Sequence, residues 1–297
     1  MSKQPDTTKT IKTADPERAL ARLHDRANRL RELGQYDEAE THFRRALELA
    51  ERLFAEDDFR LVPLLNNFAV LGKYSGDFDE AEACYQRALT IAENHLGAEH
   101  ADVATLYHNL GGLAHARGNY EAGEPLARRS VEIRERLLGA DHPDVAADMA
   151  ALAGLLDGLE RYEESEPIYR RVIDLFERRL ATGDSKAEYE IAINLNNLAA
   201  VCQATDRLGE AEELYRRALS IKETLLGVDH PDIAVTLNNL ALLLKRRGNP
   251  AEAAKMYERA LAIFERTLTP THPKLITCRT NYERLQRRLN QQISNEK

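Results

Sequence analysis

Asparagine recurs at two neighbouring positions of a repeating pattern in this chain, and its side chain is suited to binding a polypeptide backbone. The first position holds Asn67, Asn109, Asn197, Asn239 and Asn281, and the position before it holds Asn66, Asn196 and Asn238. A primary amide carries both donors and an acceptor, so a row of them can bind a peptide main chain whatever its sequence. Asparagine is also a mediocre helix former, so its recurrence needs an explanation. Two interpretations stay open, and both can hold: the row faces a groove, or it forms an internal ladder between neighbouring helices.

Basic and aromatic side chains follow these asparagines at a distance of a few residues. The candidates for contacts that give specificity are Lys73, Tyr74, Lys245 and Arg246, and the two lysines occupy equivalent positions. Cations at both ends of a groove favour an acidic peptide as the partner. The alternative is that they are solvated helix ends, where positive charge complements the negative end of the helix dipole.

The elements that must position these residues come from a repeat of 42 residues. Similar segments, such as GQYDEAETHFRRALELA at Gly34 and GDFDEAEACYQRALTIA at Gly76, begin at residues 34, 76, 118, 160, 206 and 248. The one longer step, from 160 to 206, places four extra residues in the polar stretch 181–187. Self-similarity at a fixed period is the signature of stacked repeat architectures.

Each repeat is predicted to form two helices joined by a short turn, named helix A and helix B below. In helix B, small residues alternate with large aromatic ones, as in Ala39, Phe43 and Ala46, which is what closely packed helices require. Glutamate and arginine spaced four apart, such as Glu40 and Arg44, indicate a solvated outer face. Two helices cannot bury their apolar faces alone, so the pairs must stack. We therefore expect an all-α fold, a right-handed superhelical solenoid of helix-turn-helix repeats.

The solenoid is expected to span residues 16–290, as six 42-residue repeats and a C-terminal capping helix that ends near residue 286. Residues 1–15 are expected to form a disordered polar tail, and residues 291–297 a flexible one. The fourth repeat departs from the pattern, since Ala151 replaces the asparagine and Gly154 and Gly158 lie on the same helix. Together with the insertion, this predicts a weak point or bend between repeats 1–4 and 5–6.

These features resemble the tetratricopeptide repeat, with Gly34, Ala39, Phe43 and Ala46 at its signature positions. The period of 42 residues and the sequences LGADHPDVA at 138 and LGVDHPDIAVTLNNLALL at 226 are similar to the kinesin-light-chain type. The resemblance implies that helix A lines a concave groove, where an extended or helical peptide binds, and that Asn67 hydrogen-bonds the peptide backbone. Only some 15 polar residues precede the first repeat, in place of a long coiled coil, so a stand-alone prokaryotic adaptor fits better than a motor subunit.

Composition excludes several other classes of function. The formal net charge of -8 argues against a general affinity for nucleic acid or for an anionic membrane. No apolar run is long enough for a signal peptide or a membrane span. The three cysteines, Cys84, Cys202 and Cys278, are far apart and odd in number, which suits a reducing compartment and buried apolar positions. We expect a cytoplasmic protein.

Histidines recur before helix A, at His100, His142, His230 and His272, and invite a metal interpretation. Successive repeats stack at about 10 Å, whereas Zn–N bonds are about 2 Å, so equivalent histidines cannot share an ion. They are better explained as loop residues near a helix N-terminus. No nucleotide-binding, zinc-protease or serine-hydrolase motif is present, so we expect neither an enzyme nor a cofactor.

The function that the sequence favours is a protein-interaction scaffold, which binds a peptide segment of a partner in the groove lined by helix A. One alternative is a self-associating structural module, a homo-oligomer without a peptide ligand. The other is a small-ligand receptor or an enzyme built into the superhelix.

Overall fold

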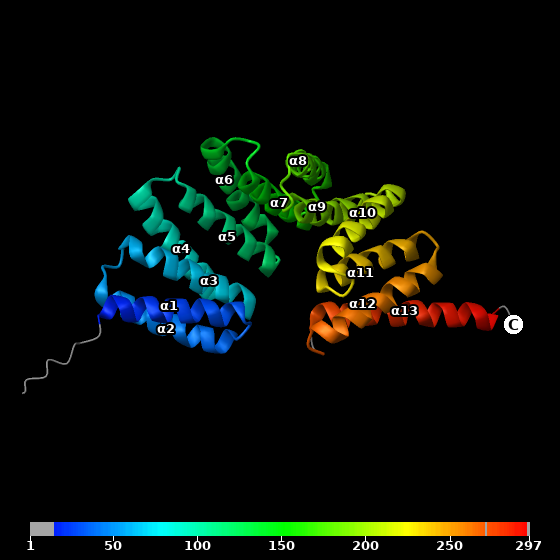
Figure 1. The fold of residues 1–297 in the computed structure, drawn as a ribbon, viewed down its shortest axis with the longest axis horizontal. Coiled ribbons are helices and arrows are strands. Elements are labelled where there is room, and N and C mark those ends of the chain that lie inside the picture. The colour runs from blue at the N-terminus through cyan, green and yellow to red at the C-terminus, as the bar shows by residue number, and fades with distance from the viewer. Residues whose placement is uncertain (1–14, 271, 296–297) are drawn as a thin grey trace, which may run out of the picture. The chain divides into compact units, whose positions relative to one another are not determined.

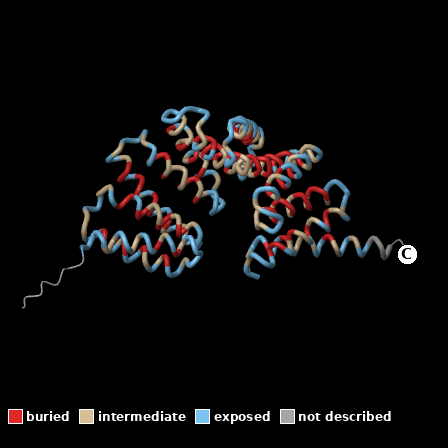
Figure 2. The backbone as a smooth tube through the Cα atoms, in the orientation of Figure 1, coloured by how far each residue is buried: buried red, intermediate tan, exposed pale blue. Residues whose placement is uncertain are grey.

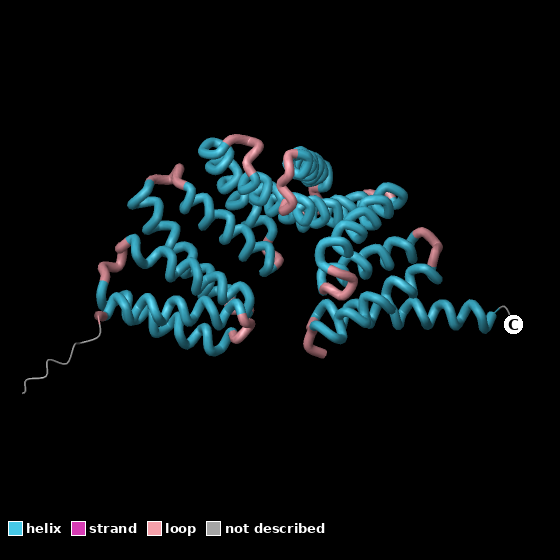
Figure 3. Tube along the Cα trace, viewed as in Figure 1, coloured by secondary structure: helices cyan, strands magenta, loops and turns pink. Residues whose placement is uncertain are grey.

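The structure is a computed structural model that describes residues 15–270 and 272–295, with side-chain environments up to residue 291. Residues 1–14 of the expected N-terminal tail lie outside the described residues, and so do residues 296 and 297 of the expected C-terminal tail. Helix and turn make up the described chain, without any strand (Figure 3). The expectation of an all-α fold is therefore confirmed.

The helices form consecutive A–B pairs joined by short turns (Figure 1). The A helices are α1 (Pro16–Glu32), α3 (Val62–Ser75), α5 (Ala101–Arg117), α7 (Pro143–Gly158), α9 (Ala187–Ala204), α11 (Pro231–Arg246) and α13 (Pro273–Asn295). The B helices are α2 (Tyr36–Leu53), α4 (Phe78–Leu96), α6 (Tyr120–Leu138), α8 (Tyr162–Ala181), α10 (Leu208–Leu226) and α12 (Pro250–Thr267), and a short 3-10 helix, η1 (Phe59–Leu61), precedes α3.

Contacts divide the chain into two units, an N-terminal unit (Met1–Ile133) and a C-terminal unit (Arg134–Lys297). In the N-terminal unit, α1 packs on α2, α2 on α3, α3 on α4 and α4 on α5. In the C-terminal unit, the same order of packing runs from α7 through to α13. The boundary falls inside α6 and not at the insertion, because α8 and α9 pack extensively across the inserted residues.

The turn before helix A explains the recurring histidines. The Nδ1 atoms of His100, His142 and His230 accept a hydrogen bond from the backbone N–H two residues further on, at 3.2, 3.1 and 3.2 Å. His272 makes the same contact with the N–H of Lys274 at 3.2 Å. Each histidine therefore caps one of the N–H groups that the first turn of a helix leaves without a partner. Their predicted place at a helix N-terminus is confirmed.

Buried residues recur along the helices of both units (Figure 2). In the B helices they follow the predicted alternation of small and large residues. Ala39, Phe43 and Ala46 of α2 are fully buried, and Tyr85, Tyr169, Tyr215 and Tyr257 occupy the place of Phe43 in later B helices. An alanine lets two helices approach closely, and the ring one turn later fills the space beside the contact. The same alternation therefore builds the core of both units.

The inserted residues lengthen helices more than the loop. The B helix before the insertion, α8, has 20 residues where α10 has 19, and α9 has 18 where α11 has 16. The predicted loop over 181–187 is thus reduced to residues 182–186, because helix continuation at both ends satisfies more backbone groups. In the same way α13 continues to Asn295, beyond the expected end near 286 and through residues 291–295 of the expected tail.

All three cysteines are buried and free. Burial raises the pKa of Cys84 and of Cys202 to about 11 and that of Cys278 to about 12. Because the thiolate is the reactive form, native thiols are expected to react with Ellman's reagent at pH 8 roughly a hundredfold more slowly than in guanidinium. Fast reaction of a folded sample would contradict this burial.

Candidate functional site

Polar side chains of three consecutive A helices form a continuous chain of hydrogen bonds in the N-terminal unit. Asn109 Nδ2 on α5 donates to Asn66 Oδ1 on α3 at 2.8 Å, and Asn66 Nδ2 donates to Asn67 Oδ1 at 3.3 Å. Asn67 Nδ2 lies 2.9 Å from Nε2 of His24 on α1 and donates to it. We call these four residues the asparagine relay. In this unit the asparagines thus form the internal ladder that the sequence left as one of two interpretations.

His24, the last residue of the asparagine relay, was not predicted from the sequence. A signal was present, because His24 precedes Asn67 by 43 residues, as Asn66 precedes Asn109. Because residue 24 is histidine and not asparagine, its equivalence to Asn66 was not recognised. Its ring packs against Phe43 with centroids 6.0 Å apart, and burial lowers its pKa, an effect that Asp25 opposes and Arg31 supports.

Two hollows lie beside the relay, one on each side of Pro63. The first, about 280 Å³, lies between α1 and α3 and is lined by Glu17, Leu20, Ala21, His24, Phe54, Arg60, Pro63 and Leu64. The second, about 210 Å³, lies between α3 and α5 and is lined by Phe59, Val62, Pro63, Asn66, Asp102, Thr105 and Leu106. His24 therefore lines the first hollow and Asn66 the second.

Lys73 and Tyr74, predicted as specificity residues, lie further along α3. The Nζ atom of Lys73 lies over Gly112 of α5, 3.0 Å from the position that a Cβ atom on residue 112 would occupy. The side chain is half-buried and makes no ion pair within the described residues, and burial lowers its pKa. Tyr74 is 61% exposed and stacks on Tyr36, with centroids 6.2 Å apart. Glycine at 112 thus leaves room for an unpaired cation between two A helices.

The asparagines of the C-terminal unit are bonded differently. Asn196 donates to Asn197 Oδ1 at 3.5 Å and Asn238 donates to Asn239 Oδ1 at 3.4 Å, each within one helix. The Oδ1 atoms of Asn196 and Asn238 are buried and accept no hydrogen bond from any described residue. No described residue accepts a hydrogen bond from the amide nitrogens of Asn197 and Asn239, whereas those of Asn67 and Asn109 each donate one. Asn281, partly buried on α13, makes no side-chain hydrogen bond to the part of the chain that is described.

A hollow of about 260 Å³ brings two predicted residues together between α9 and α11. Its lining comprises Ala200, Gln203, Ala204, Tyr215, Asn239, Leu242 and Arg246. The guanidinium of Arg246 donates to the backbone oxygen of Gln203 at 2.7 Å and to the carboxylate of Asp206 at 3.0 Å. Lys245, next to it, is partly buried and has no ion-pair partner among the described residues. Arg246 is therefore held by α9, and Lys245 is the freer cation.

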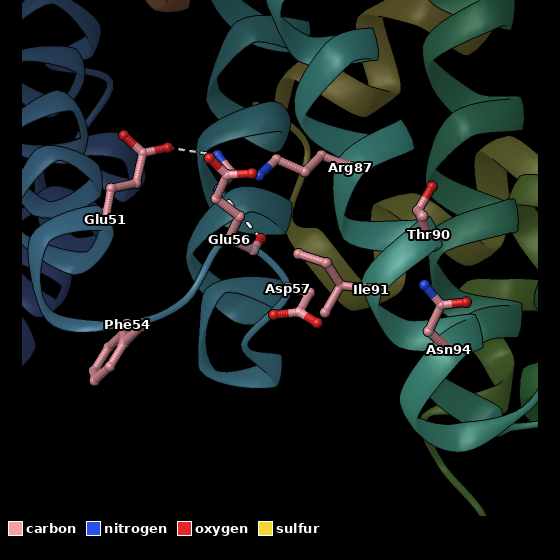
Figure 4. Close-up of a pocket in the computed structure, with 8 residues that line it drawn as sticks. All are labelled: Glu51, Phe54, Glu56, Asp57, Arg87, Thr90, Ile91 and Asn94. Carbon is pink, nitrogen blue, oxygen red and sulfur yellow. Dashed lines mark hydrogen bonds and ion pairs between the residues drawn. The ribbon is translucent and has the colours of Figure 1, made fainter.

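A further hollow, of about 580 Å³, lies at the end of α2 and along α4, away from every predicted site residue (Figure 4). Arg87 points across it to Glu51, at 2.5 Å, and to the backbone oxygen of Glu56, at 3.4 Å. Thr90, Ile91 and Asn94 of α4 complete one wall. No site was predicted there, because residues 54–58, FAEDD, differ from the segments LGAEH, LGADH and LGVDH that precede later A helices.

Two further properties concern the residues that the structure describes. Among them, no group of three or more histidine, cysteine, aspartate or glutamate side chains is placed to hold a metal ion. None of the described helices combines the length and the apolar character that crossing a membrane demands.

The comparisons with known proteins agree with this architecture. The tetratricopeptide repeat family matches residues 17–94, 64–122, 102–178, 190–266 and 233–293. No curated protein is significantly similar in sequence. Among solved structures, BtubC (BKLC) from P. vanneervenii is 25% identical, with a TM-score of 0.63 over 80% of this chain and 94% of that one.

Two other solved structures share the fold at lower identity. A putative kinesin light chain from Podosopora anserina, with nearly identical TPR-like repeats, is 22% identical over 70% of this chain and 97% of that one, with a TM-score of 0.57. The apo form of RapI is 12% identical over 92% and 99%, with a TM-score of 0.63. The chain therefore belongs to the tetratricopeptide repeat family and is an all-α repeat solenoid with kinesin-light-chain-like proteins among its structural neighbours.

Proposed function

We propose that the chain is a protein-interaction scaffold that binds an extended peptide segment of a partner along its A helices. The observation that carries this proposal is the hollow between α9 and α11, where the amide nitrogen of Asn239 is uncommitted. Asn197, on the neighbouring helix, offers its amide nitrogen in the same way. Two amides with free N–H groups on adjacent helices can donate to successive carbonyl oxygens of a peptide backbone.

An acidic peptide fits the charges on the same helices. Lys73 in the N-terminal unit and Lys245 in the C-terminal unit make no ion pair with any described residue, whereas arginines on the B helices, such as Arg44 and Arg216, are paired with glutamates. A half-buried ammonium without a counterion gains more from a carboxylate than a solvated one does. We infer that carboxylates of the partner form ion pairs with these lysines.

Replacing both Asn197 and Asn239 by alanine is expected to weaken partner binding about tenfold or more, since each lost hydrogen bond contributes roughly 0.5–1.5 kcal/mol. Partners would be isolated by affinity capture with the wild-type chain, and the bound segment then synthesised and titrated by fluorescence anisotropy. Helical content by circular dichroism should stay unchanged, because both side chains are only partly buried.

The control is Asn94→Ala, which removes an asparagine from the hollow along α4 and leaves the A helices intact. Equal affinity of the Asn197/Asn239 variant and the wild type would refute binding along the A helices. A loss confined to Asn94→Ala would move the site to the hollow of Figure 4.

A further inference from the structure

The asparagine relay runs in one direction and ends on a titratable group. Asn66 and Asn67 each accept through Oδ1 and donate through Nδ2, so donation passes from α5 to α3 and then to α1 (Figure 1). The last acceptor is Nε2 of His24. This arrangement requires an imidazole that carries its proton on Nδ1 and has a free lone pair on Nε2.

The same atoms can form the same number of hydrogen bonds in the opposite sense. The oxygen and nitrogen of an asparagine amide are nearly equal in size and exchange places by a half-turn about the last side-chain torsion, which has a broad, roughly two-fold profile. After three such turns, His24 Nε2–H donates to Asn67, Asn67 donates to Asn66, and Asn66 donates to Oδ1 of Asn109. The relay thus has two complete states, and a proton on Nε2 is compatible with the second alone.

We propose that protonation of His24 reverses the whole relay and so changes the group that Asn109, two helices away, presents to its surroundings. In the neutral state Asn109 uses an N–H within the relay and no described residue donates to its Oδ1; in the protonated state Oδ1 is used and both N–H groups are released from the relay. Asn109 lies on the A-helix face that we propose as the binding groove, so the groove exchanges an acceptor for a donor. That consequence rests on the proposed function, whereas the reversal itself does not.

The surroundings of His24 set the range of pH in which the relay reverses. Its own helix brings Asp25 and Arg31 near the ring, and Arg31 also donates to the backbone oxygen of Asn67 at 3.4 Å. From α2 the ring meets the uncharged Phe43, and η1 brings Arg60, which is paired with Asp58 at 2.7 Å and with Glu17 at 3.2 Å. Burial is the largest influence and lowers the pKa from its ordinary value of 6.5, so the relay reverses in acid, below pH 6.5.

The test is an NMR titration of the full chain labelled with ¹⁵N at asparagine and histidine, without any partner. Assignments come from single substitutions. We expect the side-chain amide signals of Asn67, Asn66 and Asn109 to shift together, with one midpoint equal to that of His24. A shift of Asn67 alone, with Asn66 and Asn109 constant between pH 7 and 5, would overturn the reversal.

Two variants establish the order of transmission. In His24→Gln, which does not titrate, all three amide shifts should disappear. In Asn66→Ala, which interrupts the relay, Asn67 should still respond to pH while Asn109 should not. Persistence of the Asn109 shift in a folded Asn66→Ala protein would also refute the proposal, and if that variant fails to fold, His24→Gln alone decides. Since no ligand is present, absence of peptide binding leaves this result unaffected.

Discussion

Asp148→Leu is expected to lower the free energy of unfolding by about 3–5 kcal/mol, the usual cost of breaking a buried ion pair by removing one partner. The carboxylate of Asp148 on α7 is buried, with 1% of the residue exposed, and it lies 3.0 Å from Nη1 of Arg134 on α6. The Arg134 side chain is itself only 14% exposed. Leucine removes the buried carboxylate that pairs with this guanidinium, and a pair shielded from water is worth more than a surface pair.

The leucine itself fits the position. Leu64 and Leu106 occupy the equivalent place in α3 and α5, where both are buried. The expected loss therefore comes from the lost ion pair and not from a poor fit. Adding Arg134→Met should recover most of the stability, because a pair of apolar side chains of similar volume often replaces a buried ion pair without loss. Urea unfolding of the four members of this double-mutant cycle measures both effects. A single variant as stable as the wild type, or a double variant less stable than the single one, would contradict this reasoning.

The repeat made most of the fold predictable. The helix pairs, the alternation of Ala39 with Phe43 and the capping place of the histidines all follow from positions that recur. Predicted pairs such as Glu40 and Arg44 are present, at 2.9 Å. Contacts between repeats were harder to predict. Arg44 also binds Glu80 on the next B helix at 2.6 Å. A whole A helix separates these two residues in the sequence, so the spacing within one helix does not reveal the pair.

For the candidate site, the sequence predicted the helices on which the asparagines lie and not the hydrogen bonds that they form. The asparagines lie on the A helices as predicted. Which amide donates to which, however, depends on differences of a few tenths of an ångström in the distances between side-chain atoms, and a sequence pattern does not specify these. Asn67, Asn197 and Asn239 each follow another asparagine on a helix A, yet only the amide nitrogen of Asn67 has an acceptor among the described residues. Arg134 was missed for a related reason, since arginine on a B helix predicts a solvated side chain.

A close contact between α3 and α4 in the N-terminal unit gives the second large effect. Gly72 of α3 is buried against α4, and a Cβ built on it would lie 2.9 Å from Ala81 Cβ and 2.9 Å from the backbone oxygen of Asp77. No rotamer can relieve these contacts, because one involves a methyl group and the other the main chain. Gly72→Ala is therefore expected to lose about 1–3 kcal/mol of stability by overpacking, although alanine is the better helix former.

Two further variants separate this contact from general effects of glycine. Gly209→Ala, within α10, has no heavy atom within 4 Å of the new Cβ, so it should leave stability unchanged or raise it by up to about 1 kcal/mol. Ala81→Gly, combined with Gly72→Ala, removes the methyl group that the new one meets and reproduces the next repeat, where Ala114 and Gly123 hold the equivalent positions. The combination should recover part of the loss and not all of it, because the Asp77 carbonyl stays in place. Thermal unfolding of the three variants measures this, and equal losses in Gly72→Ala and Gly209→Ala would show that the helices can separate freely at this point.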